Sequence, residues 1–145
     1  MSDPASPVDP ADITAQLPPY ARALGIAVDR IEHGIPMLMV DFDNRIRGRP
    51  GFLHGGAIGG LLEMAAIAAL QAELRRDGGL LKLKPVNISL EYMRGGTVQR
   101  TYAIGRVTRA GRRVANVSAE AWQDNREKPI ASCWMNFLLS PKDQA

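Results

Sequence analysis

Cysteine and histidine are scarce in this chain of 145 residues, which contains one cysteine and two histidines. Cys133 has no second cysteine with which to form a disulfide or a zinc site inside the chain, so the sequence argues against a zinc centre. The single thiol lies in a predicted strand and is interpreted as a core residue. It is also consistent with a reducing cytoplasm, which is the location that we expect.

Long uninterrupted hydrophobic runs are missing as well. The longest apolar segment lies within residues 50–70 and is interrupted by Glu63 and by glycines. It therefore falls short of the roughly 18 to 20 apolar residues that span a bilayer. The N-terminus shows no charged leader followed by an apolar stretch. We expect a soluble, unsecreted protein without a membrane partner.

Aromatic residues make up only 6% of the chain, and they do not alternate with basic residues as a nucleic-acid-stacking surface requires. The formal net charge is a modest +3, but arginines gather in local groups. These groups suit a phosphorylated small molecule better than nucleic acid, and ordinary solvated charge is the simplest alternative. The grouped arginines are Arg45, Arg47, Arg49, Arg94, Arg100, Arg106, Arg109, Arg112 and Arg113.

The length and a hydrophobic fraction of 46% predict one compact domain. We predict a disordered tail over residues 1–10, where prolines are frequent and apolar groups few. A short N-terminal helix is predicted over residues 11–24, interrupted or ended by Pro18 and Pro19. Residues 25–140 then form the single domain.

Periodicity predicts an α+β fold for this domain. The Ala- and Leu-rich residues 55–75 form one long helix, which Asp77 and the two glycines after it end. Alternating patterns before and after the helix predict an antiparallel sheet of about six strands, which must wrap the helix. The predicted strands are residues 25–32, 36–43, 86–93, 101–108, 113–122 and 129–139.

The predicted helix is apolar all round, whereas a sheet covers only one of its sides. The remaining surface needs a second cover, and another copy of the molecule is the simplest one. Gly59 and Gly60 inside the helix each cost about 1 kcal/mol relative to alanine, which is understandable if they admit a close neighbour. We infer a homodimer at least.

The predicted helix begins at Gly55 and Gly56, whose backbone N–H groups lie at the positive end of the helix dipole. Without side chains they allow a carbonyl oxygen to approach, as in an oxyanion hole, where one donor contributes about 3 to 4 kcal/mol to transition-state binding. The alternative is that the two glycines only permit a tight turn. We expect His54, just before them, to have one of three roles: to orient a substrate carbonyl, to act as an acid or to cap the helix.

Glu63 is an acid in the middle of this apolar helix. Its burial is costly unless the carboxylate is paired or faces a wet cleft. It is therefore a candidate general base toward water, or a nucleophile toward an activated carbonyl. The alternatives are an exposed position or a structural pair with an arginine. Glu63 lies eight residues after Gly55, which is about 12 Å along one helix. The two residues can therefore act on one carbonyl only if the antiparallel helices of a dimer bring them together.

The motif Leu53-His54-Gly55-Gly56, the acid nine residues after the histidine, the strand "VNISLEYMRGG" and the turn "TRAGRRVANV" resemble one known family. This family is the hotdog-fold acyl-CoA thioesterases of the phenylacetic-acid-degradation (PaaI-type) group. The resemblance extends over roughly residues 25–139. It implies the hotdog fold, a long helix wrapped by an antiparallel sheet, in a homodimer or a homotetramer. It also implies hydrolysis of acyl-CoA to a free acid and coenzyme A, and it leaves open whether the acyl group is aryl, medium-chain or branched.

Residue by residue, the resemblance implies that Gly55 donates the oxyanion-hole N–H and that Glu63 of the other subunit activates water or attacks the thioester. His54 would lie near the thioester carbonyl, and Gly56 would shape the helix start. No metal and no cofactor is implied, because coenzyme A is part of the substrate. Candidates to bind its nucleotide part are Arg94, Arg109, Arg112 and Arg113, and Asn44 is a further candidate for substrate binding.

Two positions depart from the family pattern. Relatives often carry an asparagine six residues before the histidine, where this chain has Gly48, and a serine or threonine ahead of the strand after the helix, where it has Lys84-Pro85. Two other functions therefore stand beside hydrolysis. One is a non-catalytic acyl-CoA-binding module, and the other is an enoyl-CoA hydratase that pairs His54 with Glu63 for proton transfer.

Overall fold

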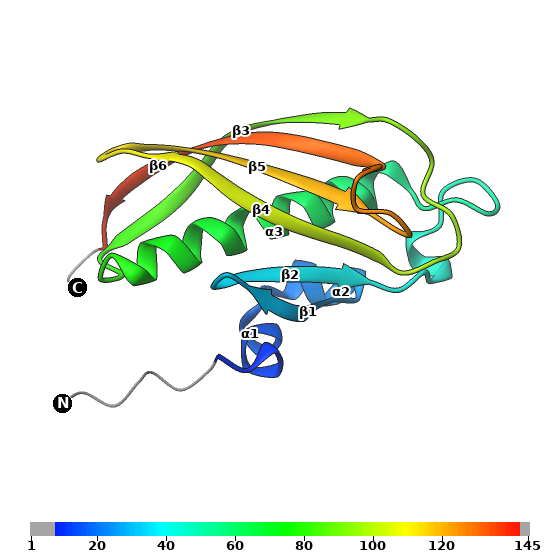
Figure 1. Cartoon of the computed structure of the whole chain (residues 1–145), viewed down its shortest axis with the longest axis horizontal. Helices are drawn as coiled ribbons and strands as arrows, with labels where there is room; N and C mark the ends of the chain where they lie inside the picture. Colours follow the sequence, from blue (N-terminus) through cyan, green and yellow to red (C-terminus); the bar gives the residue numbers. More distant parts are fainter. Residues whose placement is uncertain (1–7, 143–145) are drawn as a thin grey trace.

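A computed structural model describes residues 8–142 (Figure 1). Residues 1–7, which form most of the predicted tail, lie outside the described residues. The elements in chain order are α1 (Pro10–Gln16), α2 (Pro19–Leu24), β1 (Ile26–Glu32), β2 (Ile35–Val40), the 3-10 turn η1 (Asn44–Ile46), α3 (Gly55–Arg76), β3 (Leu81–Tyr92), β4 (Thr101–Ala110), β5 (Val114–Trp122) and β6 (Ala131–Pro141).

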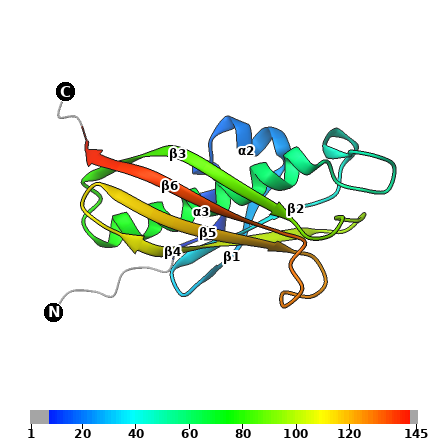
Figure 2. The same ribbon diagram turned by 90° about the horizontal axis from the view of Figure 1, so that it is seen from above.

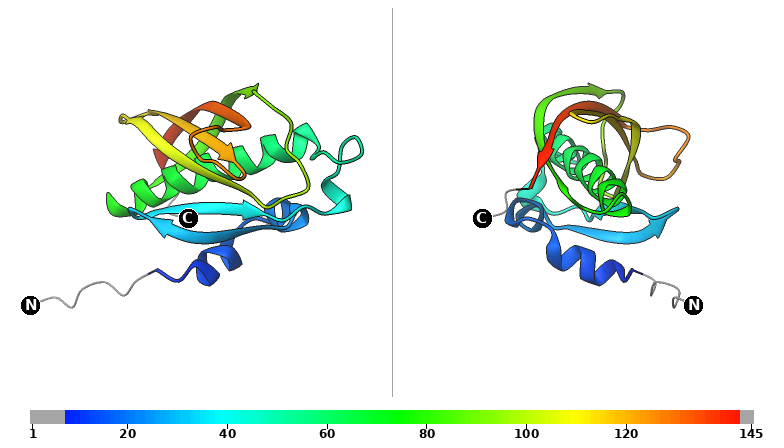
Figure 3. Two further views of the ribbon diagram at one scale, coloured as in Figure 1. Left: turned by 45° about the vertical axis from the view of Figure 1, so that its right-hand side comes forward. Right: turned by 90° about the vertical axis from the view of Figure 1, so that its left-hand side faces the viewer.

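The six strands form one antiparallel sheet in the order β1-β2-β4-β5-β6-β3. The sheet curves around α3, as the view from above and the view from the side show (Figures 2 and 3). One face of the helix, including Leu61 and Ala65, is buried against the sheet, whose inward residues include Met135 and Phe137. The predicted hotdog fold is confirmed.

The length and composition of α3 match those of a membrane span, with a hydropathy of 1.4 over its most apolar window. The expectation that its interruptions keep it below this threshold is therefore wrong. However, 72% of that window is buried inside the protein. The helix is apolar because it fills the core of the domain.

The helix lies very close to the sheet at Gly105 of β4. A β-carbon at this position would lie 2.6 Å from the carbonyl oxygen of Ala65 and 2.8 Å from the β-carbon of Ala69. The small residues on both elements therefore set the distance between helix and sheet.

The N-terminal segment forms two helices, α1 and α2, where one was predicted, because Pro18 and Pro19 separate them. These helices cover part of α3. A β-carbon at Gly60 would lie 2.5 Å from the hydroxyl of Tyr20 and 2.8 Å from Leu24 Cδ1. The prediction that Gly60 admits a close neighbour is confirmed, but this neighbour belongs to the same chain, so a second molecule is not needed at this side.

Strand β3 begins at Leu81, five residues earlier than predicted, and includes Pro85. The strand tolerates a proline because it lies at the edge of the sheet, and its register shifts between Pro85 and Asn87. The apolar residues that alternate along this strand are exposed, from 36% at Leu90 to 57% at Val86. An apolar edge strand is thus left open.

Substituting Gly105 tests the close contact between α3 and β4. Gly105→Ala places a methyl group against the helix backbone, so we expect a loss of unfolding free energy of about 1 to 3 kcal/mol. Chemical denaturation measures it, with Gly111→Ala as the control, because that methyl group meets only the carbonyl of Val114 at 3.3 Å. Equal stabilities of the two variants would contradict the close packing.

Candidate functional site

The first turn of α3 leaves one backbone donor unpaired. His54 caps the helix, because its Nδ1 accepts a hydrogen bond from the Gly56 N–H at 2.9 Å. Its carbonyl accepts from the N–H groups of Ala57 and Ile58, and its own N–H donates to the carbonyl of Ile46. Of the four donors at the helix start, only the Gly55 N–H has no partner among residues 8–142.

The geometry separates the roles predicted for the two glycines and the histidine. The Gly56 N–H is taken up by the cap, so Gly55 supplies the free donor. Since His54 Nδ1 is an acceptor, the neutral ring carries its proton on Nε2. The exposed His54 makes no hydrogen bond or ion pair with a carboxylate within the described part of the chain.

Gly55 lies at the wall of an open cavity of about 470 Å³. The cavity is also lined by Phe52 and Tyr92 and by two cations, Arg49 and Arg94. The guanidinium of Arg49 stacks on the ring of Phe52 at 4.2 Å. A carbonyl group that enters this cavity can therefore reach the helix start beside apolar and positively charged walls.

Tyr92, at the end of β3, fixes the same helix start. Its hydroxyl donates a hydrogen bond of 2.8 Å to the carbonyl oxygen of Gly55. This carbonyl belongs to the peptide unit whose N–H is held by His54, so both ends of the Gly55–Gly56 peptide are restrained. The sequence did not predict this contact, because no local pattern connects Tyr92 to a partner 37 residues away.

Glu63 is half-buried on α3 and has neither a hydrogen bond nor an ion pair among residues 8–142. The predicted alternative of an arginine pair is therefore wrong for the described chain. Gly56, Ile67 and Gln71 share this face of the helix and are also partly or fully exposed. We call Gly56, Glu63, Ile67 and Gln71 the open strip of α3.

The separation of Gly55 and Glu63 follows from the continuity of α3, which runs without interruption over 22 residues. Eight residues apart on one helix, they are about 12 Å from each other. The two groups are therefore too distant to act on one carbonyl within a chain.

Cys133 belongs to the core, as predicted. It is fully buried, and its thiol lies 3.9 Å from the carbonyl oxygen of Leu62. Burial, with a contribution from the nearby charge of Glu63, raises the pKa of the Cys133 thiol to about 11. Such a thiol is not a nucleophile at neutral pH.

The arginines that were predicted to bind the nucleotide part of coenzyme A lie at two different places in the structure. Arg109, Arg112 and Arg113 line one open groove of about 1290 Å³, together with Lys82 and Lys84. We call it the basic groove. Arg94 instead lines the cavity at Gly55. Asn44 begins the turn η1 and lines neither.

The two departures from the family pattern lie in different places. Gly48 donates a hydrogen bond to the carbonyl of Phe52, and a β-carbon on it would lie 3.1 Å from the α-carbon of His54. The loop as folded therefore leaves little room for an asparagine there. Lys84 and Pro85 lie within β3, and Lys84 lines the basic groove.

Within residues 8–142, no group of three or more histidine, cysteine, aspartate or glutamate side chains could hold a metal ion. The candidate site thus consists of a backbone donor, a carboxylate and cationic surroundings.

The family model of the thioesterase superfamily matches residues 50–130. A solved structure from Chromobacterium violaceum is 35% identical to the chain, with a TM-score of 0.71 over 92% of this chain and 91% of that one. No curated protein sequence matches the chain.

Two further solved structures share the fold at 20% identity. A variant of a thioesterase from Pseudomonas aeruginosa has a TM-score of 0.79, over 95% of this chain and 98% of that one. A variant of the phenylacetic acid degradation protein PaaI from Thermus thermophilus has a TM-score of 0.70, over 83% and 98%.

Replacing the hydroxyl of Tyr92 tests its hold on the helix start. In Tyr92→Phe the ring remains and one hydrogen bond, worth about 1 kcal/mol, is lost, so we expect amide exchange of Gly56 to become about fivefold faster. Hydrogen exchange followed by NMR measures this rate. Tyr102→Phe is the control, because Tyr102 lies on β4 and stacks on Trp122. Unchanged exchange at Gly56 would show that Tyr92 does not restrain this peptide.

Proposed function

Because the chain belongs to the thioesterase superfamily, we propose that it hydrolyses acyl-CoA to a free carboxylic acid and coenzyme A. The observation that supports this most directly is the pair of unsatisfied groups on α3. Among residues 8–142 the Gly55 N–H has no partner, and Gly55 lines a cavity. The Glu63 carboxylate is half-buried and unpaired within the same described residues.

In the proposed reaction the thioester carbonyl oxygen accepts a hydrogen bond from the Gly55 N–H. This hydrogen bond stabilises the negative charge that develops on the oxygen. Glu63 takes the proton from an attacking water, or attacks the carbonyl carbon itself to form an anhydride that water then cleaves. In both routes the carbon–sulfur bond breaks and coenzyme A leaves as the thiol after proton transfer. Both routes require the carboxylate beside the carbonyl that Gly55 holds.

The 12 Å between these groups on one helix makes a second subunit part of the proposal. An exposed apolar edge strand such as β3 is a template for pairing with another strand. If the β3 strands of two subunits pair antiparallel, their sheets become continuous and the open strips of both α3 helices face each other. Glu63 of one subunit then approaches Gly55 of the other at two symmetric sites.

The same pairing provides a place for the phosphates of coenzyme A. Within one chain, Lys84 in the basic groove and Tyr92 beside Gly55 are eight residues apart on a strand, roughly 26 Å. Antiparallel pairing brings the start of one β3 toward the end of the other. The groove with Arg109, Arg112 and Arg113 would then serve the active site formed with the Gly55 of the other subunit, and Arg94 would lie near the thioester.

The geometry does not favour a hydratase. That reaction needs a histidine paired with an acid, whereas Nδ1 of His54 is occupied by the Gly56 N–H. A binding module without turnover is tested by the same measurement as hydrolysis.

Release of free thiol from a panel of aryl, medium-chain and branched acyl-CoAs tests the proposal. The wild-type protein is expected to release coenzyme A, and Glu63→Gln to reduce kcat by about 10² or more, since the amide neither accepts the proton nor attacks. Glu73→Gln is the matched control on the same helix, because Glu73 is paired with Arg76 at 3.8 Å. Tight binding without thiol release would indicate a binding module, and full activity of Glu63→Gln would contradict the role of Glu63.

A further inference from the structure

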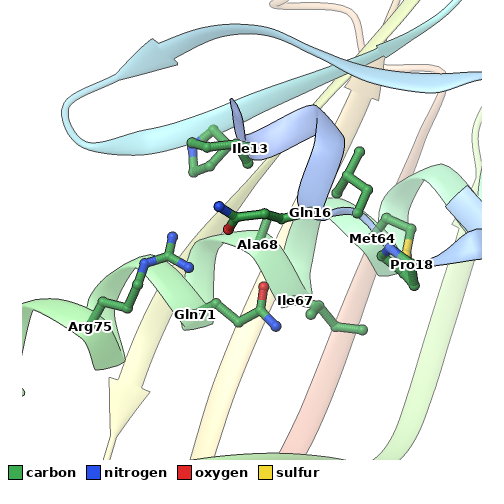
Figure 4. A pocket seen from close by; sticks show the side chains of 10 residues that line it. Ile13, Gln16, Pro18, Met64, Ile67, Ala68, Gln71 and Arg75 are labelled. Carbon is green, nitrogen blue, oxygen red and sulfur yellow. The ribbon is translucent and has the colours of Figure 1, made fainter. Parts of the chain in front are cut away.

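A second cavity, of about 310 Å³, lies between α3 and the N-terminal helices. Figure 4 shows Ile13, Gln16 and Pro18 on one side and Met64, Ile67, Ala68, Gln71 and Arg75 of α3 on the other. Most of the lining is apolar. This cavity is distinct from the one at Gly55, with which it shares no lining residue.

The cavity begins one helical turn from the carboxylate of Glu63. Ile67 lies four residues after Glu63 and Gln71 eight residues after it, so the three side chains lie along one face of α3. All three belong to the open strip. In the proposed reaction Glu63 lies beside the carbonyl carbon of the thioester. The acyl chain bonded to that carbon can therefore continue along the open strip into the cavity.

The far end of the cavity is polar. It carries the amides of Gln16 and Gln71 and the guanidinium of Arg75, and none of these side chains has a hydrogen bond or ion pair among residues 8–142. The next residue, Arg76, is instead paired with Glu73. Helix side chains lean toward the N-terminus, and in Figure 4 the guanidinium of Arg75 extends from the helix toward the cavity.

We propose that this cavity holds the acyl part of the substrate and selects medium-length acyl groups that carry a carboxylate at their far end. The distance from Glu63 to Gln71 along the helix, about 12 Å, corresponds to the reach of such a chain. The apolar walls, Met64, Ile67 and Leu17 among them, contact its methylene groups. A carboxylate matches a guanidinium and two amide groups better than a methyl group does, because it accepts several hydrogen bonds, one of them charge-assisted.

The inference rests on the proposed hydrolysis, and its test compares two thioesters of equal chain length. Octanoyl-CoA ends in a methyl group, and suberyl-CoA ends in a carboxylate. In Arg75→Met we expect kcat/KM for suberyl-CoA to fall about tenfold, the loss of one charge-assisted hydrogen bond, while kcat/KM for octanoyl-CoA stays within about twofold. Arg76→Met is the matched control, which removes the neighbouring cation and should leave the ratio of the two substrates unchanged.

Each outcome decides between the two proposals. If Arg75→Met leaves the ratio of the two kcat/KM values unchanged, the carboxylate selection is overturned and the proposed hydrolysis still stands. If Arg76→Met changes this ratio as much as Arg75→Met does, the effect is one of general surface charge. The assignment of the carboxylate end to this cavity is then overturned. Absence of thiol release from every thioester overturns the proposed function, and the acyl assignment with it.

Discussion

The hydrogen bonds at the start of α3 determine which backbone donor the proposed reaction can use. His54 binds the Gly56 N–H and, through its carbonyl, the next two donors, while Tyr92 holds the Gly55 carbonyl. Among residues 8–142 these contacts leave the Gly55 N–H without a partner and fix the peptide units on both sides of it. A donor held in this way needs no reorganisation when charge develops on a bound oxygen, which is the condition for effective electrostatic catalysis.

The same helix explains why the proposed reaction requires a second subunit. An α-helix that begins at Gly55 places Glu63 more than two turns away, and its rigidity prevents the two groups from meeting. The sheet and the helices α1 and α2 bury much of α3, whereas the residues of the open strip stay partly or fully exposed. The apolar edge of β3 is exposed on the same molecule. A second subunit placed at this edge would cover both surfaces and complete the site.

Sequence periodicity predicted the local elements well, because they depend on neighbouring residues. The predicted helix over residues 55–75 ends within one residue of α3, and the strands predicted over residues 25–32 and 36–43 begin within one residue of β1 and β2. Tertiary relations were missed. Pro85 stops a central strand but is acceptable at a sheet edge, and the alternation of β3 did not show that both faces are exposed. The Tyr92–Gly55 contact and the cover that Tyr20 gives to Gly60 join residues distant in sequence, so no local pattern could reveal them.

The proposed shared site can be tested with two variants that damage different halves of it. Glu63→Gln removes the carboxylate, and Gly55→Pro removes only the free N–H, because proline suits the first helical position and His54 already has the extended backbone, ψ 133°, that precedes proline. Each homodimer should be nearly inactive. A heterodimer, co-expressed with two tags and purified through both, contains one intact site and should regain about half of the wild-type activity per dimer. Activity no higher than that of the two parents would contradict a site formed by Gly55 of one subunit and Glu63 of the other.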